Sequence, residues 1–157
     1  MISLLDNTVM SNFAVVRRPD LLLTALGEPI ATSQQAFKEL QAGVAAGKLP
    51  PLDWAWLTVW ALKPSETIRY ERLLRRLNPG EAACLTMAVD RGCRVLTDDR
   101  DARRIARQLK IPLSGTLGVL ARLVDIRELV LAEADELLRE MITSGYRSPV
   151  TSLQDLI

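Results

Sequence analysis

Short apolar runs alternate with longer segments of helical periodicity along most of the chain. The short runs lie at residues 2–5, 29–32, 54–62, 94–97 and 111–114. Their length and apolar composition are typical of strands, and the run at 54–62 is also rich in β-forming residues and bounded by prolines. Between them, apolar residues recur every three or four positions, which is typical of helices that bury one face. The pattern therefore predicts a strand followed by a helix, five times in succession.

The predicted helices begin and end at residues that favour helix termini. They cover about 7–16, 21–26, 33–47, 65–77, 79–92, 100–110, 115–125 and 133–144. Ser33 is a favoured N-cap residue, and Gly27 and Gly92 each follow a helical segment, where glycine tolerates the left-handed backbone. Asn78-Pro79-Gly80-Glu81 combines an N-cap residue, proline at the first helical position and glutamate at the third. This combination predicts a capping box.

Alternation of strands and helices indicates an α/β fold. Parallel sheets bury both faces under helices, because each strand returns to the same edge through a helical crossover. We therefore expect a three-layer α/β/α sandwich around a central, mainly parallel, five-stranded sheet. The 157 residues suit one domain, and no low-complexity segment or linker divides them. The helices from about residue 115 onward, with a tail at 148–157, are expected to pack on the same domain.

Histidine is absent from the sequence. Without imidazole, Ser-His-Asp and Cys-His catalysis and His-ligated zinc are excluded, so proton transfer or metal binding falls mainly to carboxylates. Cys84 and Cys93 lack the spacing of a metal or redox pair, which predicts reduced, packed thiols. The apolar segments are too short to span a bilayer, and the N-terminus does not resemble a signal peptide. We expect a cytoplasmic protein without membrane association.

Several carboxylates lie where an open α/β sheet places its functional crevice, beyond the carboxyl ends of the strands. Asp6 follows the first strand, and Asp98 and Asp99 follow the fourth. Glu39 lies in the helix after the second strand, and Glu81 lies in the first turn of the helix that leads into the fourth. Clustered carboxylates repel one another, whereas Mg²⁺ or Mn²⁺ relieves the repulsion and can activate a water for phosphoryl chemistry. The cluster therefore suggests a divalent metal.

Three regions of the chain together form a more specific pattern than any one of them alone. They are Leu-Leu-Asp-Asn-Thr-Val-Met-Ser-Asn-Phe (4–13), Thr-Ser-Gln-Gln-Ala-Phe-Lys-Glu-Leu (32–40), and Gly-Glu-Ala-Ala (80–83) followed by Val-Leu-Thr-Asp-Asp-Arg-Asp-Ala-Arg (95–103). With these regions the chain resembles the PIN-domain family, which includes VapC-type toxins and many related predicted ribonucleases. The resemblance covers nearly the whole chain. It implies a three-layer sandwich with a parallel central sheet, in agreement with the periodicity.

The resemblance also implies the catalytic residues and the cofactor. The positions that match the family's acidic residues are Asp6, Glu39, Glu81 and Asp99. Asp98 or Asp101 could replace Asp99, and the implied ligands of Mg²⁺ or Mn²⁺ are Asp6, Glu81, Asp99 and Asp98. Glu81 stands where the better-known toxins commonly have aspartate. The Gly-Thr-Leu-Gly segment at 115–118 is closer to a less characterised bacterial branch of the family.

The function implied is a metal-dependent endoribonuclease that hydrolyses RNA phosphodiester bonds. If the resemblance extends to toxin–antitoxin pairs, a small antitoxin protein would cover the acidic pocket with a basic side chain or a peptide. A homodimer is also implied. One alternative is a PIN-like domain that binds RNA or protein without cleaving, and a less favoured one is a metal-dependent phosphatase or receiver-like phosphoryl acceptor. A receiver is disfavoured because Ser114-Gly115-Thr116 contains no lysine to contact a phosphoryl group.

Each candidate carboxylate also has a purely structural explanation. Asp6 could satisfy backbone groups in a turn, and Glu39 could be an ordinary solvated residue on a helix flank. Glu81 could serve only in the capping box, and the aspartates at 98–101 could serve only at the start of the following helix. These alternatives remain open at the level of sequence.

An arginine-rich segment follows the fourth predicted strand, although the net charge is only +1. Its arginines fall on one face of the predicted helix: Arg100, Arg103, Arg104 and Arg107. Beside an acidic site they could contact RNA phosphates, whereas such stripes are more often solvated faces.

Three tryptophans lie at even intervals in the predicted third strand. Trp54, Trp56 and Trp60 would point the same way on a strand. We expect them in the core or at an interface rather than stacked on bases.

Overall fold

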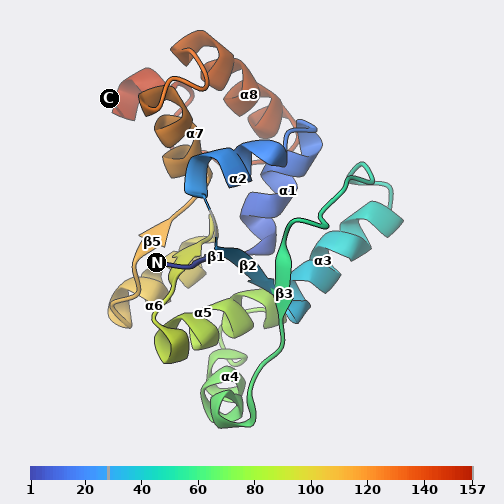
Figure 1. Cartoon of the computed structure of the whole chain (residues 1–157), viewed down its shortest axis with the longest axis vertical. Helices are drawn as coiled ribbons and strands as arrows, with labels where there is room; N and C mark the ends of the chain where they lie inside the picture. Colours follow the sequence, from blue (N-terminus) through green and yellow to red (C-terminus); the bar gives the residue numbers. More distant parts are fainter. Residues whose placement is uncertain (28, 157) are drawn as a thin grey trace.

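The fold is built around a five-stranded, all-parallel sheet (Figure 1). The structure is a computed structural model, and it describes residues 1–27 and 29–156. The strands are β1 (Ser3–Leu5), β2 (Ile30–Ser33), β3 (Thr58–Trp60), β4 (Arg94–Leu96) and β5 (Leu113–Ser114). Their order across the sheet is β3-β2-β1-β4-β5, and each pair of neighbours is parallel. Helices cover both faces, so the predicted three-layer α/β/α sandwich is confirmed.

The helices follow the strands in the predicted alternation. They are α1 (Asn7–Val15), α2 (Asp20–Leu26), α3 (Gln34–Ala45), α4 (Thr67–Leu73), α5 (Pro79–Arg91), α6 (Arg100–Gln108), α7 (Thr116–Asp125) and α8 (Leu131–Thr143), with 3-10 helices η1 (Pro64–Glu66) and η2 (Leu153–Leu156). Ser33 caps α3 as predicted, because its hydroxyl accepts the N–H of Ala36 at 2.9 Å. In the part of the chain that the structure describes, every helix is too short or too polar to span a bilayer. Ile157, the end of the predicted tail, lies outside the described residues.

The strand predicted at 54–62 is wrong at both ends, since β3 covers only Thr58–Trp60, and most of the error lies in the first part. Asp53 accepts a backbone N–H at 2.8 Å, and the N–H of Leu57 donates to the carbonyl of Trp54 at 2.9 Å. This side-chain-stabilised turn overrides the strand propensity of the aromatic residues. The tryptophans therefore do not share one strand face. Trp54 and Trp56 lie 5.7 Å apart between ring centroids and pack against one core, whereas Trp60 packs against the other.

The sheet separates two hydrophobic cores, because successive residues of a strand point to opposite faces. Leu5 and Leu96 face the core that α1, α2, α7 and α8 cover, and Leu4 and Val95 face the core under α5 and α6. All four side chains are buried. In Figure 1, α7 and α8 stand with the C-terminus at one end of the molecule, and α4 stands at the other.

The register of β1 and β4 aligns the two strand ends. Leu5 pairs with Leu96, and the N–H of Asp6 donates to the carbonyl of Leu96 at 2.9 Å. Because parallel strands end at the same edge, Asp6 is beside the residues that follow β4. On the other side of β1, the Thr32 hydroxyl donates to the carbonyl of Leu5 at 2.6 Å.

A buried ion pair joins the segment after β3 to α5. The side chain of Glu66 is inaccessible to solvent, and it accepts hydrogen bonds from Arg91 Nη2 at 2.7 Å and Nε at 3.0 Å. The guanidinium group lies 4.7 Å from the ring centroid of Trp60. The hydrogen bonds from Arg91 lower the pKa of Glu66 to about 2. A paired carboxylate of this kind stabilises the fold only while it is ionised.

We expect this pair to make stability depend on pH in the acid range. Glu66 has an ordinary pKa of 4.5 and a pKa of about 2 in the folded chain, so its contribution is fully present above pH 4.5 and is lost as the pH falls through about 2. The difference corresponds to about 3 kcal/mol. Urea unfolding followed by tryptophan fluorescence should show a smaller acid loss for Glu66→Gln than for wild type. Asp20→Asn, at an exposed ion pair, is the matched control, and equal acid losses in wild type and Glu66→Gln would contradict the assignment.

Candidate active site

Asp6 lies directly after β1 and is 1% exposed. Its Oδ2 accepts hydrogen bonds from the hydroxyls of Thr97 at 2.9 Å and Thr8 at 3.1 Å. Its Oδ1 is also buried but has no hydrogen-bond partner among the described residues. Burial raises the pKa of Asp6. An unpartnered carboxylate oxygen in the interior is costly, so this oxygen is open to a ligand.

Glu81 lies in the first turn of α5 and is 5% exposed. The predicted capping box is confirmed: the N–H of Glu81 donates to Asn78 Oδ1 at 2.9 Å, and the N–H of Asn78 donates to Glu81 Oε1 at 3.2 Å. Oε2 is buried and has no partner in the described structure. Burial raises the pKa of Glu81 to about 9, with further contributions from the carboxyl groups of Asp99 and Asp6. Oε1 of Glu81 therefore caps the helix, and Oε2 is available to a ligand.

Glu39 approaches the same region from α3. Its Oε1 accepts the N–H of Gly80 at 2.7 Å. A Cβ at residue 80 would contact this carboxylate, with Glu39 Cδ at 2.9 Å, and would lie 3.1 Å from the Cα of Ala36. Burial, followed by the charge of Asp6, raises the pKa of Glu39. Glu39 is thus tied to the start of α5 and is not an ordinary solvated side chain.

Asp99 caps α6, as its Oδ2 accepts the N–H of Ala102 at 2.9 Å. Its own N–H donates to the hydroxyl of Thr97 at 3.2 Å, so Thr97 contacts both Asp6 and Asp99. Asp99 is half-buried, and its carboxyl group lies close enough to Glu81 to raise the pKa of that glutamate. Asp99 therefore caps α6 and at the same time lies near the other carboxyl groups.

Asp98 lies beside Asp99 in sequence but is engaged elsewhere. Its Oδ1 accepts the N–H of Thr116 at 2.8 Å, and its Oδ2 accepts the side-chain amide of Asn12 at 3.0 Å and the Thr116 hydroxyl. Its N–H donates to the Thr8 hydroxyl at 2.9 Å. A Cβ at Gly115 would lie 2.6 Å from Asp98 Oδ1, so glycine permits this close approach. Asp98 therefore joins the end of β4 to α1 and the start of α7.

Threonines beside the carboxylates were not anticipated from sequence. Thr8 and Thr97 hold Asp6, and Thr116 holds Asp98. The signal was present in Asp6-Asn7-Thr8 and in Thr97-Asp98-Asp99, where a hydroxyl lies within two residues of a carboxylate at a strand end.

The thiol of Cys84 lies behind the carboxylates. Its Sγ is 3.6 Å from the carbonyl oxygen of Leu5 and 3.6 Å from the hydroxyl of Ser33. Burial, followed by the charge of Asp6, raises the pKa of Cys84 to about 12, so the group stays protonated. Cys93 is likewise buried and unbridged, and the prediction of packed, reduced thiols is confirmed.

The oxygen donors fit a hard divalent cation only in part. Among residues 1–27 and 29–156, no three acidic or cysteine side chains converge closely enough to hold a metal ion as they stand. Two neighbouring carboxylates, Asp6 and Glu81, nevertheless each keep a buried oxygen without a hydrogen-bond partner. Mg²⁺ is usually bound through one or two carboxylates and retains several waters, so this pair is a sufficient protein contribution.

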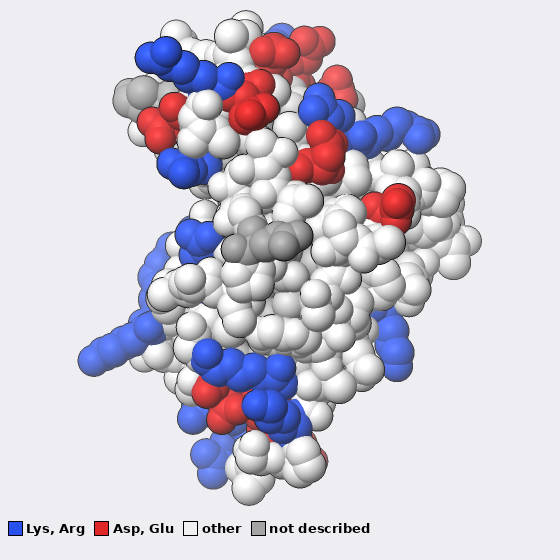
Figure 2. All heavy atoms as spheres, in the orientation of Figure 1, with Lys and Arg blue, Asp and Glu red and all other residues white. Residues whose placement is uncertain are grey.

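A groove of about 1480 Å³ lies between α1, α3, α6, the start of α7 and the segment 144–149, and Asp6 and Glu81 are not among its lining residues. Its acidic lining residues are Glu39, Asp98 and Asp99, and its basic ones are Lys48, Arg100, Arg103, Arg107 and Arg147. Figure 2 shows Lys and Arg side chains projecting at the edge where Figure 1 places α6, whereas acidic and basic groups are mixed at the α7–α8 end. The groove therefore combines carboxylates with an excess of cations.

The predicted arginine face of α6 is divided in the structure. Arg100, Arg103 and Arg107 line the groove, and Arg104 is not among its lining residues. Arg104 instead pairs with Asp101 at 3.0 Å, with both side chains more than half exposed. Arg104 therefore belongs to a solvated helix face, which was the alternative considered from the sequence. Asp101, its partner, lies outside the groove lining.

We expect Asp98→Asn to destabilise the fold by roughly 1–3 kcal/mol, because an amide cannot accept all the hydrogen bonds from Thr116 and Asn12 and leaves a buried donor unsatisfied. Asp101→Asn, three residues away and exposed, is the matched control and should change stability by less than about 0.5 kcal/mol. Urea unfolding measures both. Equal effects in the two variants would refute the structural role of Asp98.

Comparison with known proteins agrees with the α/β fold. No curated protein sequence matches the chain. The model of the family DUF3368, which is described as a PIN domain, matches residues 2–157. That span contains every acidic residue of the site. The chain therefore belongs to the PIN-domain family, whose members are generally nucleases.

Proposed function

We propose that this protein is a metal-dependent endoribonuclease that hydrolyses RNA phosphodiester bonds with Mg²⁺ or Mn²⁺. The observation that carries the proposal is a pair of buried oxygens, Asp6 Oδ1 and Glu81 Oε2, that have no hydrogen-bond partner among the described residues. The two carboxyl groups lie close enough for the charge of Asp6 to raise the pKa of Glu81. Membership of the PIN-domain family supports the nuclease class. The basic lining of the groove supports a polyanionic substrate.

Asp6, Glu81 and Asp99 would hold the ion, directly or through water, and Glu39 would complete the acidic site. When bound, the ion supplies an activated water and stabilises negative charge on the phosphoryl oxygens. Asp98, which sequence alone allowed as a fourth ligand, has hydrogen bonds at both oxygens. We assign it to positioning the loop after β4.

Each acidic side chain of the proposed site is held through one oxygen by a neutral donor. Thr97 and Thr8 hold Oδ2 of Asp6, Gly80 holds Oε1 of Glu39, and the N–H of Asn78 holds Oε1 of Glu81. These donors orient each carboxyl group and bring no positive charge of their own, which leaves a bound cation to supply it. The Glu81 carboxyl, whose pKa is about 9, is protonated at neutral pH before an ion binds.

Three finer assignments accompany this proposal. A role as the toxin of a toxin–antitoxin pair would require a small antitoxin protein that covers the carboxylates with a basic side chain or a peptide. A homodimer is expected from the same resemblance, and a cytoplasmic location is expected from the composition. These assignments are independent of the chemistry, and loss of any one of them would leave the ribonuclease intact.

A second candidate function is an RNA- or protein-binding module that does not cleave. The observation in its favour is that no three-ligand group is assembled among the described residues. The two candidates differ in whether Mn²⁺ or Mg²⁺ binds at Asp6 and Glu81.

Cleavage of a labelled, mixed-sequence RNA should require Mn²⁺ or Mg²⁺ and should stop in EDTA. Asp6→Asn and Asp99→Asn should each lower the rate by about 100-fold or more, because each removes charge that the proposed ion requires. Asp101→Asn, which lies outside the groove lining, should cleave at the wild-type rate. If wild type cleaves no RNA and calorimetry detects no Mn²⁺ binding, the binding module replaces the nuclease.

Mn²⁺ should raise the melting temperature more at about pH 8 than at about pH 5.5. Below its pKa of about 9, Glu81 holds a proton that the ion must displace, and this competition strengthens as the pH falls. Without metal, stability should instead decrease as the pH rises from 4.5 towards 9, because the folded chain retains this proton longer than the unfolded chain. Scanning calorimetry checks both trends. A Glu81→Gln variant that kept them would contradict the assignment.

A further inference from the structure

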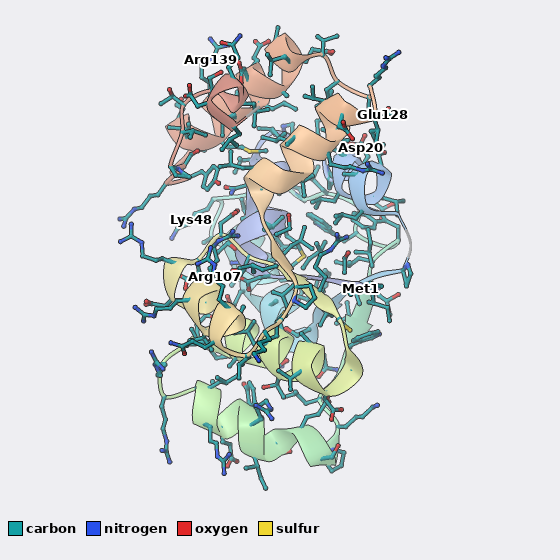
Figure 3. The ribbon with its side chains drawn as sticks, turned by 90° about the vertical axis from the view of Figure 1, so that its left-hand side faces the viewer. Met1, Asp20, Lys48, Arg107, Glu128 and Arg139 are labelled. Carbon is teal, nitrogen blue, oxygen red and sulfur yellow. The ribbon has the colours of Figure 1, made fainter. Side chains whose placement is uncertain are left out.

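The groove has cationic residues that do not belong to α6. Lys48 comes from the loop after α3, and Arg147 comes from the segment between α8 and η2. We refer to residues 144–149, which all line the groove, as the C-terminal wall. Figure 3 labels Lys48 and Arg107 on the same side of the molecule, although they come from different elements.

Hydrogen bonds to α8 hold the chain in place on both sides of the C-terminal wall. At its start, Gly145 has a φ of 118°, which favours glycine, and the N–H of Tyr146 donates to the carbonyl of Met141 at 2.9 Å. Beyond its end, Leu153 is fully buried, and its N–H donates to the side chain of Asp135 at 2.8 Å. Both anchors lie on or beside α8. The C-terminal wall is therefore an ordered part of the groove.

Tyr146 connects this wall with the carboxylate end of the groove. Its ring packs against the core. Burial and then the nearby charge of Asp98 raise the pKa of its hydroxyl. Asp98 and Tyr146 both line the groove, so the wall adjoins the loop that follows β4.

The basic residues of the groove differ in what they already bind. Arg103 Nη1 donates to the carbonyls of Thr97 at 2.8 Å and Ser114 at 3.0 Å, so its guanidinium is committed to the strand ends. Lys48 and Arg147 are exposed, and neither forms a side-chain hydrogen bond or an ion pair within the described residues. A cationic side chain that is not already paired with a carboxylate can bind a phosphate group of a ligand.

We propose that Lys48 and Arg147 bind backbone phosphates of a single RNA strand, which the C-terminal wall aligns along the groove. This inference rests on the proposed function, and it adds binding residues outside α6. A single strand is favoured because Asp6 and Glu81 are buried, at 1% and 5% exposure, and adjoin the groove only through their neighbours Glu39 and Asp99, which line it. A flexible strand can follow a cationic groove down to buried carboxylates, whereas a stiff duplex contacts proteins across its outer grooves.

Binding is measured without cleavage, by fluorescence anisotropy of a labelled single-stranded RNA of about 12 nucleotides with the Asp6→Asn protein. In this background Lys48→Ala and Arg147→Ala should each weaken binding about 3- to 10-fold at low salt. Each should also reduce the slope of log Kd against log salt concentration by about 0.7, the value for one phosphate contact on a single strand. Arg147→Lys, which retains the charge, should restore the slope.

Arg122→Ala is the matched control, because Arg122 is an exposed arginine of α7 outside the groove lining. It should leave affinity and slope unchanged, and a duplex of the same sequence should bind at least about tenfold more weakly than the single strand. Equal losses for Arg147→Ala and Arg122→Ala, or equal affinity for duplex and single strand, would overturn the inference. Single-strand binding that depends on Lys48 and Arg147, in a protein without cleavage activity, would support it while rejecting the nuclease.

Discussion

The parallel register of β1 with β4 is the constraint on which the site depends. Leu5 pairs with Leu96, so the first residues after the two strands are neighbours at one edge of the sheet. Asp6 is thereby held by Thr97, and the loop after β4 carries Asp99 towards Glu81. A shift of one residue would turn each strand's side chains to the opposite core, so hydrophobic packing enforces the alignment that brings the carboxylates together.

Bringing carboxylates together in a buried place has an electrostatic consequence. The pKa values of Asp6, Glu39 and Glu81 are all raised, with burial as the largest cause. Neutral donors occupy one oxygen of each group, whereas Asp98 has both oxygens occupied. The fold thus separates the carboxyl groups that keep one oxygen without a hydrogen bond among the described residues from Asp98, which holds the loop after β4 in place. A bound cation would both reduce the repulsion between the carboxylates and coordinate the oxygens that lack a hydrogen-bond partner.

Periodicity and helix-capping residues predicted the alternation of elements, because both are local properties of the chain. Asp6 and Glu81 could be identified for the same reason, since each lies next to an element end. The different roles of Asp98 and Asp99 could not be predicted, because partners of Asp98 lie 86 and 18 residues away. The meeting of Lys48 and Arg147 at one groove could not be predicted, because they come from distant segments of the chain. The segment beginning at Trp54 was misassigned because the strand propensity of its aromatic residues outweighed the single turn residue Asp53.

The central claim is that a divalent ion binds between Asp6, which follows β1, and Glu81, in the first turn of α5. Anomalous diffraction from crystals grown with Mn²⁺ tests it most directly, because the signal locates the metal independently of activity. We expect a peak within coordination distance of Asp6 and Glu81, about 2.0–2.3 Å from Asp6 Oδ1 or Glu81 Oε2, with Asp99 bound directly or through water. No peak at saturating Mn²⁺, or a peak only at Asp98 or Asp101, would contradict the claim.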